Sequence, residues 1–268
     1  MNIWELFKLE GKTALITGGA RNLGFDMALA LAEAGAQVAV TGTVLDKAQA
    51  SAARIAHATG RKAVGYQLDV RSEDNVAAVM DDMVRDFGKL DILINNAGNV
   101  QSTPETAPFE KRSLEMWQDV IDINLTGVFL CSKHAVALSM KPNRSGNIIN
   151  IGSAAGIIGK DRRIYAGTDM GGATLDYHAA KGGVIMMTRD MAVYLAPDNI
   201  RVNCISPGGF QRANHSDTFV NAYNNLVPMG RMGIDGKELK GAAVFLASEA
   251  SSYVTGHNLV VDGGMTAW

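Results

Sequence analysis

The chain has 268 residues, of which 47 % are hydrophobic and 19 % are charged, and its formal net charge is −2. The hydrophobic content supports a sizeable core and excludes a disordered chain, while the near balance of charge gives no general attraction to nucleic acids or anionic membranes. The length suits one large α/β domain. Because the sequence contains no evident linker, repeat or low-complexity segment, we predict a single domain over residues 1–268.

The cysteines and the N-terminus bear on cellular location. Cys131 and Cys204 lie in apolar stretches with no partner at metal-ligand spacing, so we predict buried free thiols, no disulfide and no bound metal. The N-terminal segment has charges inside its apolar stretch and lacks the core of a signal peptide, and no run of 18 apolar residues follows. These features predict a cytoplasmic protein without a membrane span.

Short apolar segments alternate with longer segments of helical periodicity. Most short segments are apolar at consecutive positions, which is typical of strands buried on both faces of a parallel sheet. We predict strands at 13–16, 37–41, 63–68, 91–94, 147–151, 201–205 and 258–261. We predict helices at 24–34, at 46–59, from the N-cap Ser72 to Gly88, and at 113–138, 177–195 and 236–247. The alternation predicts an α/β fold with a doubly wound, mostly parallel sheet of seven strands and helices on both faces.

A glycine-rich turn follows the first predicted strand. It reads Thr17-Gly18-Gly19-Ala20-Arg21-Asn22-Leu23-Gly24, and a predicted helix follows. Glycine allows the backbone to approach a pyrophosphate closely, and the N-terminus of the helix carries partial positive charge. The pattern indicates a nucleotide site, with a plain tight turn as the alternative.

This turn resembles the T-G-x-x-x-G-x-G turn of the short-chain dehydrogenase/reductase family, with Asn22 at the middle glycine; Asn tolerates the left-handed backbone conformation well. Three further motifs match that family in order, namely Asp69-Val70, Asn95-Asn96-Ala97-Gly98 and Pro207-Gly208. The resemblance implies a Rossmann fold that binds NAD or NADP. The residues implied to contact the cofactor are Gly18, Arg21, Asn22, Leu23, Gly24, Thr43, Asp69, Val70, Asn96, Ala97, Gly98, Tyr177, Lys181, Pro207 and Gly208.

Tyr177 and Lys181 are the first candidate catalytic residues. Residues four apart share one helix face, and a nearby cation favours the phenolate, so we expect Lys181 to lower the pKa of Tyr177. The resemblance implies that Tyr177 donates a proton to the developing alkoxide and that Lys181 also binds the nicotinamide ribose. It further implies that Ser153 binds the substrate oxygen and that Asn124 holds a water beside the lysine. The implied reaction interconverts a secondary alcohol and a ketone by hydride transfer.

Tyr165 competes with Tyr177 for the proton-donor role. In this chain 23 residues separate Ser153 from Tyr177, more than is usual in the family, and Tyr165 lies nearer the usual distance. The i+4 neighbour of Tyr165 is Asp169, whose charge would raise the pKa of a phenol. Residues 159–172 are also rich in glycine and charge, unlike a regular helix. We therefore assign the role to Tyr177 and interpret residues 160–171 as an insertion at the mouth of the site.

The choice between NAD and NADP usually depends on the residues just after the second strand. An acidic residue there binds the ribose 2′-hydroxyl, and a basic residue accommodates the 2′-phosphate. The chain has Thr41-Gly42-Thr43-Val44 at this place and therefore neither type. Arg21 resembles a basic residue found in many NADP-preferring relatives, with a solvated loop residue as the alternative. The sequence favours NADP slightly.

Three segments are expected to contact the substrate, namely 99–109, the insertion 160–171 and 209–227. Their arginines and a histidine, Arg162, Arg163, Arg212 and His215, are candidates for binding an anion, because arginine suits carboxylate and phosphate groups. The candidate substrate-binding residues are Ser153, Arg163, Tyr177, His178 and Arg212. These segments contain little aromatic or long apolar sequence, which favours a small polar substrate such as a sugar, sugar acid or polyol.

Two alternatives to this function stay open. One is reduction of a 3-oxoacyl or other carbonyl substrate, and the other is a nucleotide-binding regulator on the same fold without catalysis. Relatives in the family are mostly tetramers that pair through the helices corresponding to 113–138 and 177–195, so a homotetramer is implied. We also interpret the terminal Trp268 as a residue that reaches a neighbouring subunit.

Overall fold

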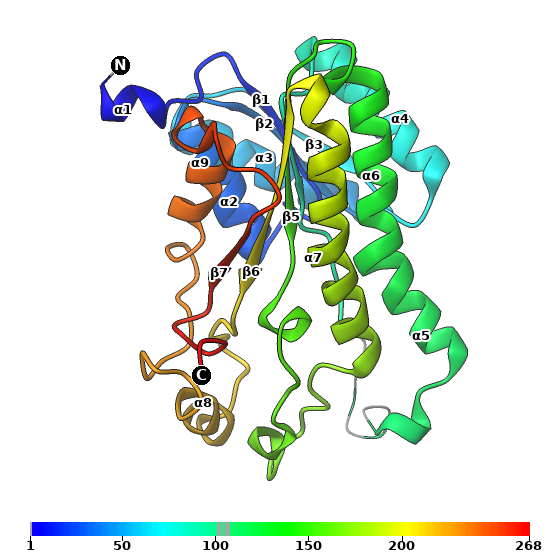
Figure 1. Cartoon of the computed structure of the whole chain (residues 1–268), viewed down its shortest axis with the longest axis vertical. Helices are drawn as coiled ribbons and strands as arrows, with labels where there is room; N and C mark the ends of the chain where they lie inside the picture. The colour runs from blue at the N-terminus through cyan, green and yellow to red at the C-terminus, as the bar shows by residue number, and fades with distance from the viewer. Residues whose placement is uncertain (1, 101–102, 104, 106–107) are drawn as a thin grey trace.

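The computed structural model describes residues 2–100, 103, 105 and 108–268. A seven-stranded sheet in the order β3-β2-β1-β4-β5-β6-β7 lies at its centre, and every neighbouring pair is parallel (Figure 1). The predicted α/β class is confirmed, and each predicted strand is present to within two residues. The strands are β1 Thr13–Ile16, β2 Gln37–Gly42, β3 Ala63–Gln67, β4 Ile92–Asn95, β5 Gly146–Ile151, β6 Ile200–Pro207 and β7 Asn258–Val261.

Helices cover both faces of the sheet (Figure 1). Side chains of α2, α3 and α9 pack on one face, and those of α4, α6 and α7 pack on the other. The α-helices are α1 Ile3–Leu6, α2 Asn22–Glu33, α3 Leu45–Thr59, α4 Glu73–Phe87, α5 Leu114–Ile121, α6 Gly127–Ala135, α7 Leu175–Leu195, α8 Asp217–Asn224 and α9 Lys240–Ala247.

The alternation of side chains along each strand divides the core into two layers. In β1, Ala14 and Ile16 belong to the layer under α2, α3 and α9, whereas Leu15 belongs to the layer under α4, α6 and α7. All three are fully buried. Because both faces of a strand are covered, consecutive apolar residues are required, which explains why these strands do not alternate with polar residues.

Some predicted helix boundaries were wrong. The predicted helix 113–138 is a continuous helical segment that contains two π-helical stretches, η2 Asp122–Thr126 and η3 Val136–Met140. The predicted helix 236–247 begins only at Lys240, because Gly236 has a φ of 75° and the residues up to Leu239 form turns. Helices α1 and α8 were not predicted, since each is short. The Ser72 N-cap and the end at Gly88 are confirmed, and Ser72 Oγ accepts a hydrogen bond from Asn75 N.

The helical segment Leu114–Met140 is long and apolar enough, by length and composition alone, to cross a membrane. In this fold 44 % of the most apolar 18-residue stretch of this segment is buried. Its inner side packs on the sheet, with α4 on one side and α7 on the other. This burial is what is expected of a helix that covers one face of a sheet.

The direction of the strands determines where a ligand can bind. All carboxyl ends lie at one edge of the sheet, and the strand order reverses between β1 and β4. At such a reversal the following segments diverge to opposite faces and leave a crevice at the carboxyl edge. The residues after β1, β4, β5 and β6 therefore meet at the lower end of the molecule in Figure 1.

Gly65 of β3 gives a test of how closely α3 packs on the sheet. A Cβ at Gly65 would lie 2.3 Å from the carbonyl carbon of Ala48, and this neighbour is backbone that cannot rotate away. We expect Gly65→Ala to lower the free energy of unfolding by about 3 kcal/mol. In Gly241→Ala, a helical control with nothing within 4 Å, we expect no loss or a gain of about 0.5–1 kcal/mol. Urea denaturation measures both, and equal stability of the two variants would contradict the prediction.

Candidate active site

A cleft of ≈ 500 Å³ lies at the carboxyl edge, where the strand order reverses. It runs past the glycine-rich turn, the ends of β2 and β3, and the segment after β4. Eleven residues predicted to contact a cofactor line it: Gly18, Arg21, Asn22, Leu23, Gly24, Thr43, Asp69, Val70, Asn96, Ala97 and Gly98. The structure thus brings together in one cleft four segments that are distant in the sequence.

The backbone of the turn approaches the segment after β4 very closely. Gly18 has a φ of 62°, and a Cβ on it would lie 3.0 Å from Cα of Ala97. A Cβ on Gly24 would lie 2.4 Å from Nδ2 of Asn96. Asn22 has a φ of 50°, so the expectation that Asn adopts the left-handed conformation here is confirmed. Glycine at positions 18 and 24 therefore lets the turn pack directly against the segment after β4, and the cleft beside the N-terminus of α2 fits a dinucleotide.

Two side chains fix this turn, namely Thr17, to which the sequence analysis gave no role, and Asn96. The Thr17 hydroxyl accepts hydrogen bonds from the backbone N–H groups of Asn96 and Ala97, both at 3.0 Å. In return, Asn96 Nδ2 donates to the carbonyl oxygens of Thr17 at 2.9 Å and Gly18 at 3.2 Å. Thr17 directly precedes the first glycine of the motif, which is the sequence signal for it.

The far end of the cleft is rich in cations. Asp69 lines it, but its carboxylate is bound by the guanidinium of Arg71 at 2.7 Å, and this hydrogen bond lowers the pKa of Asp69. Lys47 of α3 lines the cleft beside Thr43 and was not identified from the sequence, although it lies in the first turn of the helix after β2. Arg21 and Lys47 add positive charge to the lining, whereas the charge of Arg71 is balanced by Asp69.

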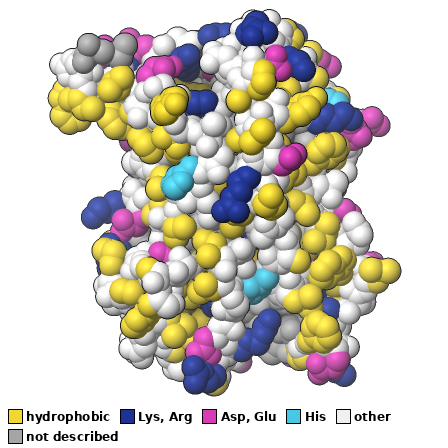
Figure 2. Space-filling model, viewed as in Figure 1, with side chains coloured by type: hydrophobic (Ala, Val, Ile, Leu, Met, Phe, Trp, Pro, Cys, Tyr) yellow, Lys and Arg dark blue, Asp and Glu magenta, His cyan; other side chains and the backbone are white. Residues whose placement is uncertain are grey.

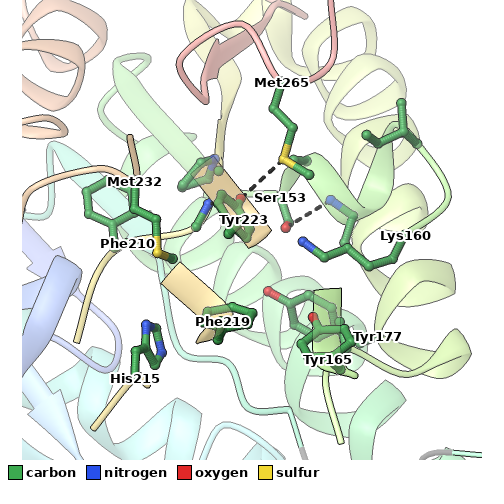
Figure 3. A pocket seen from close by; sticks show the side chains of 17 residues that line it. Ser153, Lys160, Tyr165, Tyr177, Phe210, His215, Phe219, Tyr223, Met232 and Met265 are labelled. Atoms are coloured by element: carbon green, nitrogen blue, oxygen red, sulfur yellow. Dashed lines mark hydrogen bonds between the residues drawn. The ribbon is translucent and has the colours of Figure 1, made fainter. Parts of the chain in front are cut away.

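A smaller pocket of ≈ 170 Å³ lies beyond the ends of β5 and β6. Ser153 and Tyr177 line it, together with Pro207 and Gly208, which were predicted to contact the cofactor. Figure 3 shows the side chains around it, with Tyr165 and Tyr177 on one side and aromatic and methionine side chains on the other.

Lys181 lies next to Tyr177 and is buried, with 3 % of its surface exposed. Its Nζ is 5.7 Å from the centroid of the Tyr177 ring and donates a hydrogen bond to the carbonyl oxygen of Ile151 at 2.7 Å. Burial lowers the pKa of Lys181 to about 8. The expected proximity of Tyr177 and Lys181 on one helix face is present.

The expectation that Lys181 lowers the pKa of Tyr177 is not met in this structure. Burial raises the pKa of Tyr177, and only a hydrogen bond with the Ser153 hydroxyl opposes that effect. The physical reason is the direction of the ammonium group, whose hydrogen bond goes to the Ile151 carbonyl at the end of β5. A phenol with a raised pKa stays protonated at neutral pH and can act as an acid.

Asn124 and Gly98 adjoin Lys181. A Cβ on Gly98 would lie 2.8 Å from Oδ1 of Asn124 and 3.6 Å from Nζ of Lys181. Asn124 is fully buried, and its Nδ2 donates to the carbonyl oxygens of Asn99 at 2.8 Å and Val120 at 2.9 Å. It belongs to the π-helical stretch η2, a local geometry that is frequent at functional sites.

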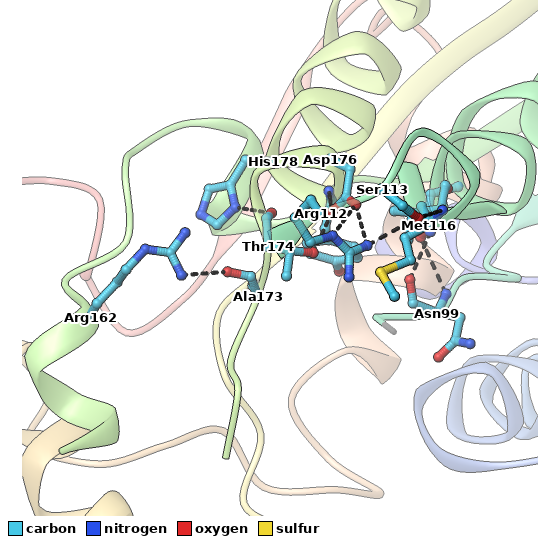
Figure 4. A network of polar contacts seen from close by, with 12 residues as sticks. Asn99, Arg112, Ser113, Met116, Arg162, Ala173, Thr174, Asp176 and His178 are labelled. Carbon is cyan, nitrogen blue, oxygen red and sulfur yellow. Dashed lines mark hydrogen bonds and ion pairs between the residues drawn. The ribbon is translucent and has the colours of Figure 1, made fainter. Parts of the chain in front are cut away.

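A buried ion pair fixes the start of α7. The guanidinium of Arg112 binds the carboxylate of Asp176 with an Nε–Oδ2 distance of 3.0 Å, and the two side chains are 3 % and 0 % exposed (Figure 4). Asp176 also accepts a hydrogen bond from the backbone N–H of Tyr177 at 2.8 Å. The sequence analysis missed this pair, because its members lie 64 positions apart in the chain.

Tyr165 also lines the pocket, and the charge of Arg162 acts to lower its pKa. Its ring stacks on Phe219 with centroids 5.6 Å apart, and burial raises its pKa. The expected cause of that rise, the charge of Asp169, is therefore wrong. The expectation that residues 159–172 do not form a regular helix is confirmed, since only a 3₁₀ turn, Arg162–Tyr165, is present there.

The expected anion-binding side chains do not meet in this pocket. Arg163 binds Asp161 and is 90 % exposed, while Arg162 donates to the carbonyl oxygen of Ala173 at 3.3 Å (Figure 4). Arg212 forms an ion pair with Asp235 and lines the cofactor cleft. His178 lies outside the pocket, with Nδ1 2.8 Å from the carbonyl oxygen of Thr174. Of the expected group, only His215 lines the pocket.

The walls of the pocket differ from the expectation of little aromatic content. Aromatic and thioether side chains line it: Tyr165, Phe210, Phe219, Tyr223, Met232 and Met265. Met232 and Met265 come from outside the three expected segments. Of the segment 99–109, residues 101, 102, 104, 106 and 107 lie outside the described residues.

The chain is similar to known proteins in both sequence and fold. Residues 18–266 match the family model described as enoyl-(acyl carrier protein) reductase. The chain is 37 % identical to 5-keto-D-gluconate 5-reductase of Escherichia coli (strain K12) over 97 % of its own length and 98 % of the relative. It is 38 % identical to the 3-oxoacyl-[acyl-carrier-protein] reductase of Chlamydia trachomatis serovar D over 96 % and 98 % of the two chains. A solved structure of gluconate 5-dehydrogenase from Burkholderia cenocepacia J2315, in complex with NADP and tartrate, is 34 % identical with a TM-score of 0.88 over 100 % of both chains.

The buried ammonium of Lys181 predicts a stability effect that depends on pH. Its pKa of about 8 lies below the ordinary value of 10.5, so between these values the unfolded chain binds more protons than the folded one. The stability of the wild type relative to Lys181→Met should therefore rise from pH 8 to 10.5. At pH 7 the burial penalty of about 3 kcal/mol exceeds the loss of one hydrogen bond, about 1 kcal/mol, so Lys181→Met should have the higher Tm.

The control is Lys237→Met, at an exposed position. Its Tm difference from the wild type should not change across the same pH range. A Tm of Lys181→Met that lies below that of the wild type at pH 7, or a difference that is independent of pH, would contradict the prediction.

Proposed function

Because the chain belongs to the short-chain dehydrogenase/reductase family, and is thus an NAD(P)-dependent oxidoreductase acting on CH–OH groups, we propose that it interconverts a keto sugar acid and the corresponding hydroxy acid. The observation that carries the proposal is the convergence of Ser153, Tyr177 and Lys181 beside a cleft shaped for a dinucleotide. We further propose that residues 1–268 form one catalytic domain.

We assign the chemistry as follows. NAD(P)H supplies a hydride to the ketone carbon when it is bound, and NAD(P)⁺ accepts one in the reverse direction. Ser153 donates a hydrogen bond to the carbonyl oxygen, and Tyr177 gives its proton to the developing alkoxide. Tyr177 is protonated at neutral pH, so in the direction of reduction it carries the proton that the alkoxide receives.

Lys181 and Asn124 have supporting roles in this proposal. Lys181 is assigned to the nicotinamide ribose; its ammonium donates to the Ile151 carbonyl, so a lowered pKa of Tyr177 is not assigned to it. Asn124, held by the backbone of Asn99, is assigned a water beside the lysine. Gly98 allows these groups to adjoin, since a side chain there would collide with Asn124.

The preferred cofactor is proposed to be NADP. Arg21 and Lys47 line the cleft near Thr43, and Gly42 at the end of β2 offers no carboxylate that would repel a 2′-phosphate. Arginine and lysine are both phosphate-binding side chains, and they lie at the end of the cleft away from Tyr177.

The substrate is proposed to be small. The ≈ 170 Å³ of the pocket is below the range of about 300–1,000 Å³ usual for sites of drug-sized ligands. A six-carbon acid is small, and two relatives are named for gluconate or keto-gluconate. A second candidate, the reduction of a 3-oxoacyl group, is favoured by the aromatic and thioether wall and by the relative named for that activity.

We further propose that the protein is a homotetramer and is located in the cytoplasm. The outer sides of α6 and α7 expose large apolar side chains, and Figure 2 shows hydrophobic side chains on the face where these helices lie. Phe129 is 51 % exposed, Met186 60 % and Val193 78 %. Burial of such residues between subunits would remove this apolar surface from water.

Tyr177→Phe and Tyr165→Phe test the assignment of the proton donor. We expect Tyr177→Phe to lower kcat at least about 100-fold, because general acid catalysis typically contributes 10²–10⁴-fold. Tyr165→Phe keeps the ring that stacks on Phe219 and should lower kcat less than about 10-fold. Steady-state kinetics at pH 7 measure both, and the reverse order of the two losses would reassign the role to Tyr165.

A substrate and cofactor panel tests the activity itself. We expect NADPH-dependent reduction of 5-keto-D-gluconate with kcat/KM at least about 10-fold above that with NADH, since one charge-assisted contact to the 2′-phosphate is worth this factor. Acetoacetyl thioester is the competing substrate, and Tyr177→Phe is the inactive control. Faster reduction of the thioester would favour the second candidate function, and a preference for NADH would overturn the proposed cofactor.

A further inference from the structure

Lys160 is a cation that lines the substrate pocket. Among the described residues that line this pocket there is no Asp or Glu. His215 also lines the pocket, but burial and the charge of Arg212 lower its pKa, so it is neutral at pH 7. Its Nδ1 accepts a hydrogen bond from the backbone N–H of Arg212 at 3.3 Å, which leaves Nε2–H as a neutral donor. Lys160 is therefore the source of positive charge in the lining.

The ammonium of Lys160 is held in position by Tyr223. Its Nζ lies over the Tyr223 ring, 4.4 Å from the centroid (Figure 3). The Tyr223 hydroxyl accepts a hydrogen bond from the backbone N–H of Gly209 and donates to Sδ of Met265 at 3.2 Å. A cation over a fixed aromatic face keeps its position and retains free N–H donors, because the face of the ring uses none of them.

The carboxylate next to Lys160 in the sequence binds another cation. Both oxygens of Asp161 bind the guanidinium of Arg163, at 2.9 Å from Nε and 2.7 Å from Nη2. Burial lowers the pKa of Lys160 to about 8, and the charge of Asp161 opposes this effect, so the ammonium persists at neutral pH although it is partly removed from water. A partly desolvated cation whose neighbouring carboxylate binds another cation gains from an anion that enters with a ligand.

Lys160 comes from the part of the chain that distinguishes this sequence from the usual family pattern. It is the first residue of the insertion 160–171, between Ser153 and Tyr177. It therefore reaches the pocket from the same loop that carries Tyr165, on the side opposite Phe210 and Met232 (Figure 3).

We propose that Lys160 binds a carboxylate of the substrate and is the residue that makes this enzyme prefer acidic substrates over neutral ones. The proposal rests on the proposed function, in which Ser153 and Tyr177 bind the ketone group at the other end of the substrate. Both groups line one small pocket, so the ketone and the carboxylate belong to a single small molecule. Nε2–H of His215 adds a neutral donor for a substrate hydroxyl or carboxylate oxygen.

The test compares a substrate with its neutral isostere. The substrates are 5-keto-D-gluconate and its primary amide, which differ in charge but hardly in shape. In the wild type kcat/KM should be higher for the acid than for the amide, and Lys160→Met should lower the acid value about 10- to 100-fold while leaving the amide value within about 3-fold. Lys160→Arg should restore most of the preference for the acid.

Arg162→Met is the matched control. It removes one positive charge from the same insertion, but its side chain is exposed, lies outside the pocket and donates to the Ala173 carbonyl rather than to Asp161. It should keep the acid-to-amide ratio of the wild type. An unchanged ratio in Lys160→Met, an equal loss on both substrates, or the same loss in Arg162→Met would overturn the proposal.

A binding measurement separates this proposal from the proposed function. Tartrate, a small dicarboxylate, is titrated into the NADPH complex by calorimetry, which needs no turnover. We expect Lys160→Met to weaken tartrate binding about 10-fold or more relative to the wild type and Arg162→Met. If the wild type reduces neither keto substrate, the proposed function fails. Equal tartrate affinity of the wild type and Lys160→Met overturns the role of Lys160.

Discussion

Helices cover both faces of the seven-stranded sheet, so its polar side chains can reach solvent or a ligand only at the ends of the strands. The polar residues inside must satisfy one another. Asn95 Nδ2 donates to Oδ1 of Asn150, and Nδ2 of Asn150 donates to the Thr188 hydroxyl, both at 2.9 Å. All chemistry is thereby concentrated at the carboxyl edge, where the strand order reverses and backbone N–H groups face the cleft.

At that edge, the site contains buried ionisable groups, whose burial costs stability, and an ion pair that fixes their positions. Lys181 is buried as a cation against the carbonyl oxygen of Ile151, and burial raises the pKa of Tyr177 beside it. The start of α7 is held by the buried pair of Arg112 and Asp176. These buried groups lower the stability of the protein but have a fixed geometry, which is usual where a reaction needs preorganised groups.

The sequence alone predicted the structure correctly where residues close together in the chain determine it. The spacing of Tyr177 and Lys181 follows from the period of a helix, and the left-handed conformation of Asn22 follows from its place in the turn. It was insufficient where loop geometry decides the direction of a side chain. Arg163 was expected in the pocket, but the 3₁₀ turn directs it to Asp161 and solvent, while Lys160, three positions earlier, lines the pocket.

The hydrogen bond from Tyr223 to Met265 makes the last residues of the chain part of the substrate pocket. Nε1 of Trp268 lies 3.4 Å from the carbonyl oxygen of Leu226 in the same chain, so the tail packs against the segment after α8. The N-terminal helix α1 lies at the opposite end of the molecule (Figure 1). An affinity tag fused to the C-terminus would therefore disturb the side chain on which Lys160 rests, whereas one fused to the N-terminus would leave specificity untouched.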